Sequence, residues 1–207
     1  MISRLSHQSQ IICRLREGNK VRKLIFAINL TLDGCCDHTK LSSNDEIHEH
    51  YTQLMRDIDV LVFGRKTYEL MVPFWPEVAK NQSGETKAVN DFAQEFASKH
   101  IIVFSRSLDT PAGPNTKILH GNLEDEILKL KQQPGKDILV GGVSLPTELI
   151  ELGLVDEYRF VVQPIFVGEG RRLMEDVNLP QKLELELIES KTFQSGAIAL
   201  RYAKSNH

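Results

Sequence analysis

Cysteine is scarce in this sequence: there are three cysteines in 207 residues, and two of them, Cys35 and Cys36, are neighbours. An odd number of cysteines that includes an adjacent pair is poor material for the disulfide framework of a secreted protein. The cysteine content therefore favours a reducing compartment, and we expect a cytoplasmic protein.

Long apolar runs and a strong net charge are also missing. No apolar stretch is long enough to cross a membrane, and the N-terminus lacks the continuous apolar core of a secretory signal. The formal net charge is only −3, so the chain has no broad attraction for nucleic acid or anionic lipid. We therefore expect no nucleic-acid or membrane partner, and any site for an anion must be local.

Three common site signatures are absent as well. No G-x-G-x-x-G follows the first predicted strand, and no G-x-x-x-x-G-K-[ST] phosphate loop occurs. The Cys-Cys-Asp-His segment at residues 35–38 lacks C-x-x-C spacing, and His48 and His50 fall on different faces of a predicted helix. We therefore predict no metal site.

What the sequence does contain is an ordinary globular composition, with 41% hydrophobic and 26% charged residues. This length can close one sizeable core, so a single domain is expected. Residues 1–20 show no sustained periodicity and end in a Gly-Asn turn signal. We interpret residues 1–20 as an N-terminal extension and residues 21–204 as the folded domain.

Strand-like and helix-like segments alternate through that domain. Unalternating apolar runs, typical of strands covered on both faces, occupy residues 60–64, 101–105 and 137–142. Helical patterns occupy residues 43–58, 88–98, 122–132 and 144–153, with Ser43 and Glu46 as a capping box and Ser144 as an N-cap. The tail at residues 183–203 is typical of an antiparallel hairpin. The pattern predicts an α/β fold with a mostly parallel sheet and a C-terminal antiparallel hairpin.

Glycine, hydroxyl and basic residues follow three of the predicted strands. The first strand end carries Gly64 and Thr67 around the basic pair Arg65 and Lys66, the second carries Ser-Arg at 105–106, and the third carries Gly-Gly at 141–142. Alone, each is typical of a solvated loop or a tight turn. The carboxyl ends of parallel strands meet at one edge of a sheet, so together they favour a nucleotide or dinucleotide site.

The segments VFGRKTYE, IVFSRS and ILVGG, in that order, resemble the cofactor-binding segments of dihydrofolate reductase-like proteins. The segments INLTLDG, PFWPE and PIFVGEGRRL resemble more closely the C-terminal reductase domain of bifunctional riboflavin-biosynthesis enzymes and its stand-alone relatives. The resemblance extends from about Val21 to Tyr202. It implies a three-layer αβα fold and places the natural start of the protein near Val21.

The resemblance further implies an NADPH-dependent reductase, usually a homodimer, that delivers hydride to a C=N type bond of a small heterocyclic or ribosyl substrate. It implies a bond between Gly141 and Gly142 that is cis in well-known family members, which would let backbone lie against the cofactor. The implied cofactor-binding residues are Gly64, Arg65, Lys66, Thr67, Ser105, Arg106, Gly141, Gly142, Val143 and Ser144.

On the substrate side, the resemblance suggests Asp33 as the catalytic residue, which orients the substrate or relays a proton. Phe74 and Trp75 are expected to stack on a flat ring, and Gly168 and Gly170 to border it. Alternatives stay open at this point, because Asp33-Gly34 is equally typical of a simple turn and Trp75 of a surface-loop anchor.

The sequence departs from the family at two positions. The substrate-binding carboxylate of dihydrofolate reductases falls near His48, and the arginine that binds the ribose phosphate in the riboflavin pathway falls at Met55, one residue from Arg56. One residue turns a helical side chain by about 100°. We expect a reductase of the 5-amino-6-(5-phosphoribosylamino)uracil type. The alternatives are dihydrofolate reductase activity, a nucleotide-binding protein without turnover and a structural dimerisation domain.

Overall fold

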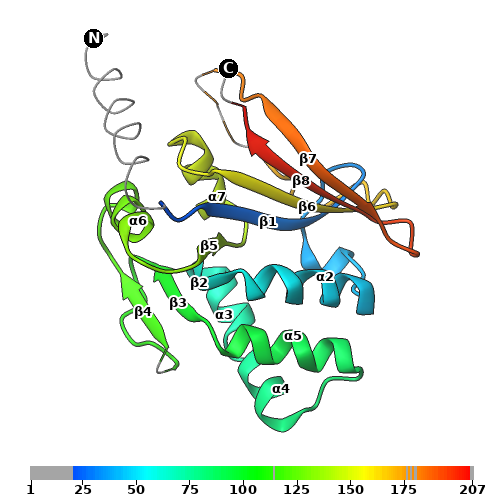
Figure 1. The fold of residues 1–207 in the computed structure, drawn as a ribbon, viewed down its shortest axis with the longest axis horizontal. Coiled ribbons are helices and arrows are strands. Elements are labelled where there is room, and N and C mark those ends of the chain that lie inside the picture. The colour runs from blue at the N-terminus through cyan, green and yellow to red at the C-terminus, as the bar shows by residue number, and fades with distance from the viewer. Residues whose placement is uncertain (1–20, 114, 176, 178, 180, 206–207) are drawn as a thin grey trace.

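A computed structural model of the chain describes residues 21–113, 115–175, 177, 179 and 181–205. The N-terminal extension expected at residues 1–20 lies outside this part of the chain. The described residues form one eight-stranded sheet with helices packed on both faces (Figure 1). The expected α/β class is therefore confirmed.

The strands lie in the order β4-β3-β2-β5-β1-β6-β8-β7 across the sheet. Their bounds are β1 Leu24–Thr31, β2 Ile58–Gly64, β3 His100–Phe104, β4 Thr116–Leu119, β5 Asp137–Val140, β6 Glu157–Gln163, β7 Leu185–Thr192 and β8 Ile198–Lys204. Neighbours from β4 to β6 are parallel, and β8 is antiparallel to both β6 and β7. This confirms the mostly parallel sheet with a C-terminal hairpin. Strand β4 was not expected, because its four residues, TKIL, form no clear apolar run.

The helices form one layer on each face of the sheet. Their bounds are α2 Asp45–Arg56, α3 Arg65–Met71, α4 Trp75–Asn81, α5 Lys87–Ala97, α6 Leu123–Gln132 and α7 Ser144–Glu151, and a 3-10 turn, η1, spans His38–Lys40. Helices α6 and α7 bury Ile127 and Leu149 against one face, whereas α2, α3 and α5 bury Leu54, Tyr68 and Phe96 against the other. The three-layer architecture is thus confirmed. None of the described helices is both long and apolar enough to cross a membrane.

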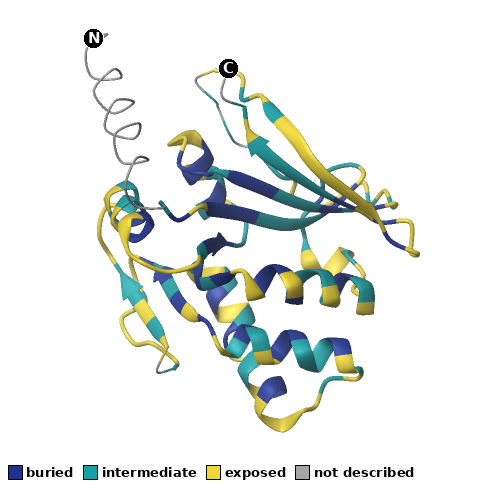
Figure 2. Cartoon of the chain, in the orientation of Figure 1, coloured by how far each residue is buried: buried dark blue, intermediate teal, exposed yellow. Residues whose placement is uncertain are grey.

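The central strands show why their sequences do not alternate. In β2, the consecutive residues Leu61 and Val62 point to opposite faces, yet both are 0% exposed. Figure 2 shows the dark blue of buried residues concentrated in these central strands and on the inner sides of the helices. A strand covered by helices on both faces requires apolar residues at every position.

The start of α2 differs from the prediction by one residue. Asn44, not Ser43, is the N-cap, and its Oδ1 accepts from the Ile47 N–H at 3.0 Å. The Glu46 carboxylate instead accepts from the Gln194 N–H at 2.9 Å, in the turn between β7 and β8. The predicted capping box is therefore wrong, because the Glu46 side chain contacts a distant turn and not the backbone at the start of its own helix.

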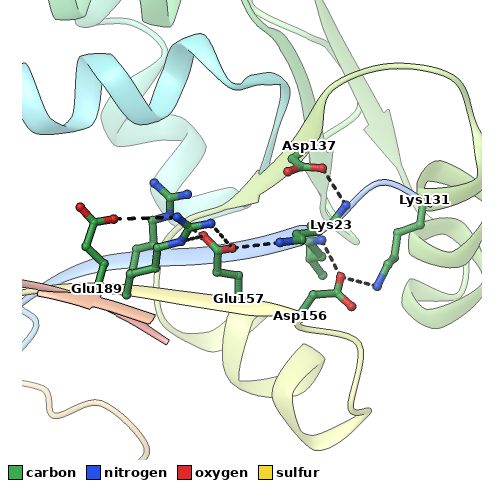
Figure 3. Close-up of polar contacts among 9 residues, drawn as sticks. Lys23, Lys131, Asp137, Asp156, Glu157 and Glu189 are labelled. Atoms are coloured by element: carbon green, nitrogen blue, oxygen red, sulfur yellow. Dashed lines mark hydrogen bonds and ion pairs between the residues drawn. The ribbon is translucent and has the colours of Figure 1, made fainter. Parts of the chain in front are cut away.

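A network of charged side chains joins the N-terminal ends of the parallel strands, opposite the edge where the site residues lie (Figure 3). The Glu157 side chain, 3% exposed, accepts from Arg159 Nε at 2.6 Å and from Arg201 Nε at 2.9 Å. Nearby, the Asp156 carboxylate accepts from Lys131 Nζ at 2.6 Å. Burial alone would raise the pKa of Glu157, but the two arginines outweigh it and lower that pKa. The network therefore contains a buried carboxylate that stays ionised.

Candidate active site

The three strand ends singled out in the sequence lie side by side. Strand β2 is flanked by β3 and β5, and all three run parallel (Figure 1). Gly64 is in register with Phe104, and Val62 is in register with Val140. The residues that follow these strands, Ser105 and Gly141, therefore start from the same edge of the sheet as Gly64. The convergence expected from the sequence is present.

Gly142 packs directly against the start of α3. Its φ is +94°, and a Cβ at this position would overlap Thr67 Oγ1. A Cβ on Gly141 would lie 2.9 Å from the ring of Phe63. Both glycines are thus required by close approach within the protein itself, and this contact brings the first and third predicted segments together.

The peptide bond between the two glycines differs from the expectation. The structure contains no cis peptide bond among the described residues, so the bond between Gly141 and Gly142 is trans. The cis geometry carried over from the family is therefore wrong for this structure. The positive φ of Gly142 turns the chain from β5 toward α7 instead.

Arg65 connects the first strand end to the second. Its Nη1 donates to Ser107 Oγ at 2.9 Å, and its Nε donates to Glu69 Oε1 at 2.7 Å. Arg65 and Lys66 are both exposed at the first turn of α3. Two cations therefore border the convergence of the strands. Ser107 was not expected as a site residue, although the IVFSRS segment ends on it.

Ser105 and Arg106 differ in what they offer to a ligand. Ser105 is 9% exposed, and its Oγ accepts from the N–H groups of Ser107 and Leu108 at 3.2 and 3.0 Å. Arg106 is exposed next to this turn. The serine hydroxyl therefore shapes the turn, and the guanidinium of Arg106 is the group with access to a phosphate.

Helix α7 begins one residue earlier than predicted. Val143 is the N-cap and Ser144 is the first helical residue, so the expected Ser144 cap is wrong. The hydroxyl of Ser144 accepts from Arg171 Nη2 at 3.1 Å instead. Because Arg171 lies in the segment after β6, this contact brings the loop that contains Gly168 and Gly170 to the first turn of α7.

A cavity of about 380 Å³ lies beside this contact, between α7 and residues 171–175 and 177. Its lining includes Ser144, Thr147, Glu148, Arg171 and Met174. Only Ser144 among these was expected from the sequence. The available signal was the pair Arg171-Arg172 in PIFVGEGRRL, which was used for the resemblance but not as a site.

The Asp33 carboxylate accepts hydrogen bonds from β1 and from the loop after β6. It accepts from Thr31 Oγ1 at 2.6 Å, from the Gly168 N–H at 2.9 Å and from the Val167 N–H at 3.3 Å. The Thr31 hydroxyl, followed by the Gly168 N–H, lowers the pKa of Asp33 far below that of an ordinary carboxyl. Asp33 and Gly168 are therefore brought together, while the catalytic assignment of Asp33 stays a prediction.

Trp75 and Phe74 lie at the start of α4. The Trp75 ring packs edge-on against Phe92, with centroids 4.6 Å apart, and against His48, with centroids 6.0 Å apart. Phe74 is 56% exposed and contacts Trp75. The ring contacts described for Trp75 join α2, α4 and α5 and include no residue of the three strand ends. Its stacking on a substrate stays a prediction.

The position expected for the folate carboxylate is occupied by His48. Its Nδ1 lies 3.0 Å from the Asn44 carbonyl oxygen, and burial lowers the pKa of the imidazole. The neighbouring carboxylate of Asp45 accepts from Thr86 Oγ1 at 2.6 Å. Among the residues described, no three His, Cys, Asp or Glu side chains group in a way that could hold a metal ion.

Comparison with known proteins identifies the family. The model of the RibD C-terminal domain matches residues 22–199. The Bacillus subtilis (strain 168) protein YyaP is 34% identical over 191 residues, which cover 88% of this chain and 95% of YyaP.

Two solved structures share the fold. A candidate riboflavin biosynthesis protein from Shewanella sp. PV-4 has a TM-score of 0.69 at 19% identity, over 89% of this chain and 99% of that one. Dihydrofolate reductase from Enterococcus faecalis, in complex with NADP(H), has a TM-score of 0.59 at 16% identity, over 89% of this chain and 97% of that one. The chain therefore shares its fold with a dihydrofolate reductase and belongs to the RibD C-terminal domain family.

Proposed function

We propose that this protein is an NADPH-dependent reductase that transfers hydride to a C=N type bond of a pyrimidine-like or pterin-like substrate, of the 5-amino-6-(5-phosphoribosylamino)uracil reductase type. The observation that carries the proposal is the meeting of three segments at one sheet edge, where Gly142 packs on Thr67 and Arg65 binds Ser107. Membership of a family of RibD-type reductases supports the same reading.

The residues at this edge suit a phosphorylated dinucleotide. Gly64 and Gly142 bring backbone close to the sheet edge, and α3 and α7 both begin there. Free N–H groups at helix starts and the nearby cations Arg65 and Lys66 favour phosphate oxygens. Arg106 is assigned to the 2′-phosphate of the adenosine, because a guanidinium can bind phosphate with two parallel hydrogen bonds.

When bound, NADPH supplies the hydride from its nicotinamide ring. The contribution of this chain is to bind and orient the two reactants. The connection from β5 to α7 contains Gly141, Val143 and Ser144, which are assigned to the nicotinamide side of the cofactor. The cavity beside Ser144 and Arg171 provides space next to this connection.

The test is the preference between the two nicotinamide cofactors. Quenching of Trp75, the only tryptophan in the chain, or NADPH absorbance would report binding. NADPH should bind more tightly than NADH, and Arg106→Ala should weaken NADPH binding about tenfold or more with little effect on NADH, because one charge-assisted phosphate contact is lost.

Arg56→Ala is the matched control, since it removes another exposed arginine, whose Nε lies 3.4 Å from Glu95 on the helix layer. Equal binding of NADPH and NADH by the wild type would contradict the assignment of Arg106. Tight NADPH binding without oxidation in the presence of pyrimidine, pterin or dihydrofolate substrates would favour a nucleotide-binding protein without turnover. Oxidation with dihydrofolate alone would favour dihydrofolate reductase activity.

A further inference from the structure

The loops that follow β1 and β6 are joined by backbone pairing. Cys35 and Arg172 form an isolated antiparallel bridge, and the Leu173 N–H donates to the Gly34 carbonyl at 3.0 Å. We call this contact between residues 33–36 and 167–173 the loop clasp. The two loops are more than 130 positions apart in the sequence, so only the fold brings them together.

The Asp33 side chain contacts both loops of the clasp. Its carboxylate accepts from the N–H groups of Val167 and Gly168, and Arg172 Nε donates to its carbonyl oxygen at 3.0 Å. The Arg172 guanidinium also lies 3.6 Å from the carboxylate. Each of these groups is a hydrogen-bond donor or a cation. The arrangement therefore suits a carboxylate that keeps its negative charge rather than one that exchanges protons.

The clasp extends to the edge of the sheet through Arg171. The Cys36 N–H donates to the Arg171 carbonyl at 2.8 Å, which fixes the backbone of that residue. The Arg171 side chain then reaches Ser144 Oγ, at the first turn of α7. The position of this guanidinium is therefore set on one side by the clasp and on the other by the helix.

The clasp also covers a thiol. Cys35 is 0% exposed, and a Cβ on Gly170 would lie 2.9 Å from its Sγ. Gly170 therefore lies directly against this sulfur. Movement of the loop away from β1 would expose Cys35, so the reactivity of that thiol reports whether the clasp is closed.

We propose that Asp33 is a positioning residue: its carboxylate closes the loop clasp and thereby keeps Arg171 at the first turn of α7, beside the segments assigned to the cofactor. Asp33 acts through the loop and not by transferring a proton. The role in cofactor binding rests on the proposed function, whereas the closure of the clasp does not.

The first measurement is the rate at which Cys35 reacts with an aromatic disulfide reagent, which its thiolate attacks with release of a coloured thiol. Cys13→Ser and Cys36→Ser are introduced in every protein so that Cys35 is the single thiol. Asp33→Ala should raise the labelling rate about tenfold or more, because hydrogen bonds to a charged acceptor are lost. Asp33→Asn should raise it less, since its Oδ1 can still accept from the Gly168 N–H.

Asp37→Ala is the matched control. Asp37 lies on the same loop, and its carboxylate accepts from the Thr39 N–H at 3.0 Å within η1 rather than from the β6 loop. Its removal should leave the Cys35 rate close to that of the parent protein. Urea unfolding of each variant separates opening of the clasp from global loss of stability, because labelling through global unfolding would rise by the same factor as the unfolding equilibrium constant.

The second measurement is the affinity for NADPH. Asp33→Ala and Arg171→Ala should each weaken binding several-fold, and the double variant should be no weaker than the poorer single variant, because both substitutions act through the same guanidinium. Arg171→Ala should leave Cys35 protected, since its backbone contacts in the clasp remain.

Each outcome tests a different part of the proposal. An unchanged Cys35 rate in both Asp33 variants would overturn the positioning role, whatever the NADPH result. Additive losses in the double variant would overturn the connection through Arg171. Failure of the wild type to bind NADPH would contradict the proposed function, while a faster Cys35 reaction in Asp33→Ala would still support the clasp.

Discussion

At the scale of single residues, Gly142 shows how one position can join two parts of a site. Its backbone has a φ of +94°, a conformation that side chains with a Cβ rarely adopt, and the missing Cβ leaves the space that Thr67 occupies. The positive φ and the lack of a Cβ are therefore both required at Gly142. Thr67 and Gly142 belong to segments 75 positions apart, so the requirement comes from the assembled sheet edge.

We predict that Gly142→Ala destabilises the protein by about 2–4 kcal/mol, because backbone strain adds to overlap with Thr67. Urea unfolding at pH 7 measures the loss of unfolding free energy. Gly34→Ala separates the two causes: its φ is +78° but a Cβ would meet nothing within 4 Å, so a loss of about 1 kcal/mol is expected.

Gly113→Ala supplies the neutral comparison, since the position is open and its φ lies outside the left-handed region. A Gly142→Ala variant as stable as Gly113→Ala would show that the contact with Thr67 relaxes without cost.

At the scale of secondary-structure elements, charge and not only apolar packing joins the strands. Glu157 on β6 binds Arg201 on β8 and Lys23 at the start of β1. Removal of one partner from a buried ion pair leaves the other charges uncompensated, which is more costly than loss of an exposed pair. The edge hairpin is thus attached to the parallel sheet in part by this network.

We predict that the wild type loses stability in acid partly through Glu157. Its pKa in the folded protein is lower than its ordinary value of 4.5, so its contribution is complete above that pH and is lost as the pH falls through the folded pKa. Glu157→Gln should lower the unfolding free energy at pH 7 by about 3 kcal/mol and flatten the decline below pH 4.5.

Thermal unfolding between neutral and acidic pH measures both effects. Glu189→Gln is the control, because Glu189 binds the same Arg201 but is 65% exposed. It should change stability by less than about 1 kcal/mol. An equal loss in the two variants would show that burial of Glu157 is not the cause.

At the scale of the whole molecule, the C-terminal hairpin and the loop after β6 carry large apolar side chains that are exposed to solvent. Four large ones lie on β7, β8 or the loop after β6, with exposed fractions from 39% to 78%: Phe166, Leu187, Ile188 and Ile198. Apolar side chains that stay exposed on an edge strand are typical of protein interfaces. We propose that a second copy of the chain covers this edge, in agreement with the homodimer implied by the family resemblance.

Sedimentation equilibrium should therefore give twice the 23.5 kDa mass of one chain. Ile198→Glu should shift the equilibrium toward monomer, because a charge would be buried in the interface. Leu152→Glu is a control of equal exposure, 39%, at the C-terminal end of α7, and it should leave the mass unchanged. Monomeric wild-type protein at micromolar concentration would contradict the proposal.

The amino-acid sequence by itself determined the order and type of most elements and the residues that end β2, β3 and β5. Both can be recognised in short stretches of sequence, because an apolar run such as VLVFG requires a strand that is buried on two faces. Once such strands lie parallel, their carboxyl ends meet at one edge of the sheet. For the same reason the approximate position of the candidate site could be predicted without coordinates. Strand β4 was missed because its pairing with β3, and not its own pattern, makes it a strand.

Only the tertiary structure decided what individual side chains do at that edge. Local pattern assigned Glu46 to its own helix end and Ser144 to a cap, but Gln194 and Arg171 contact them instead, and Asp33, which the family resemblance places at the substrate, also accepts from the Gly168 N–H. Each of these partners lies 27 or more positions away in the sequence. A hydrogen bond depends on distance in space, and sequence periodicity carries no information about which distant loop the fold brings within reach.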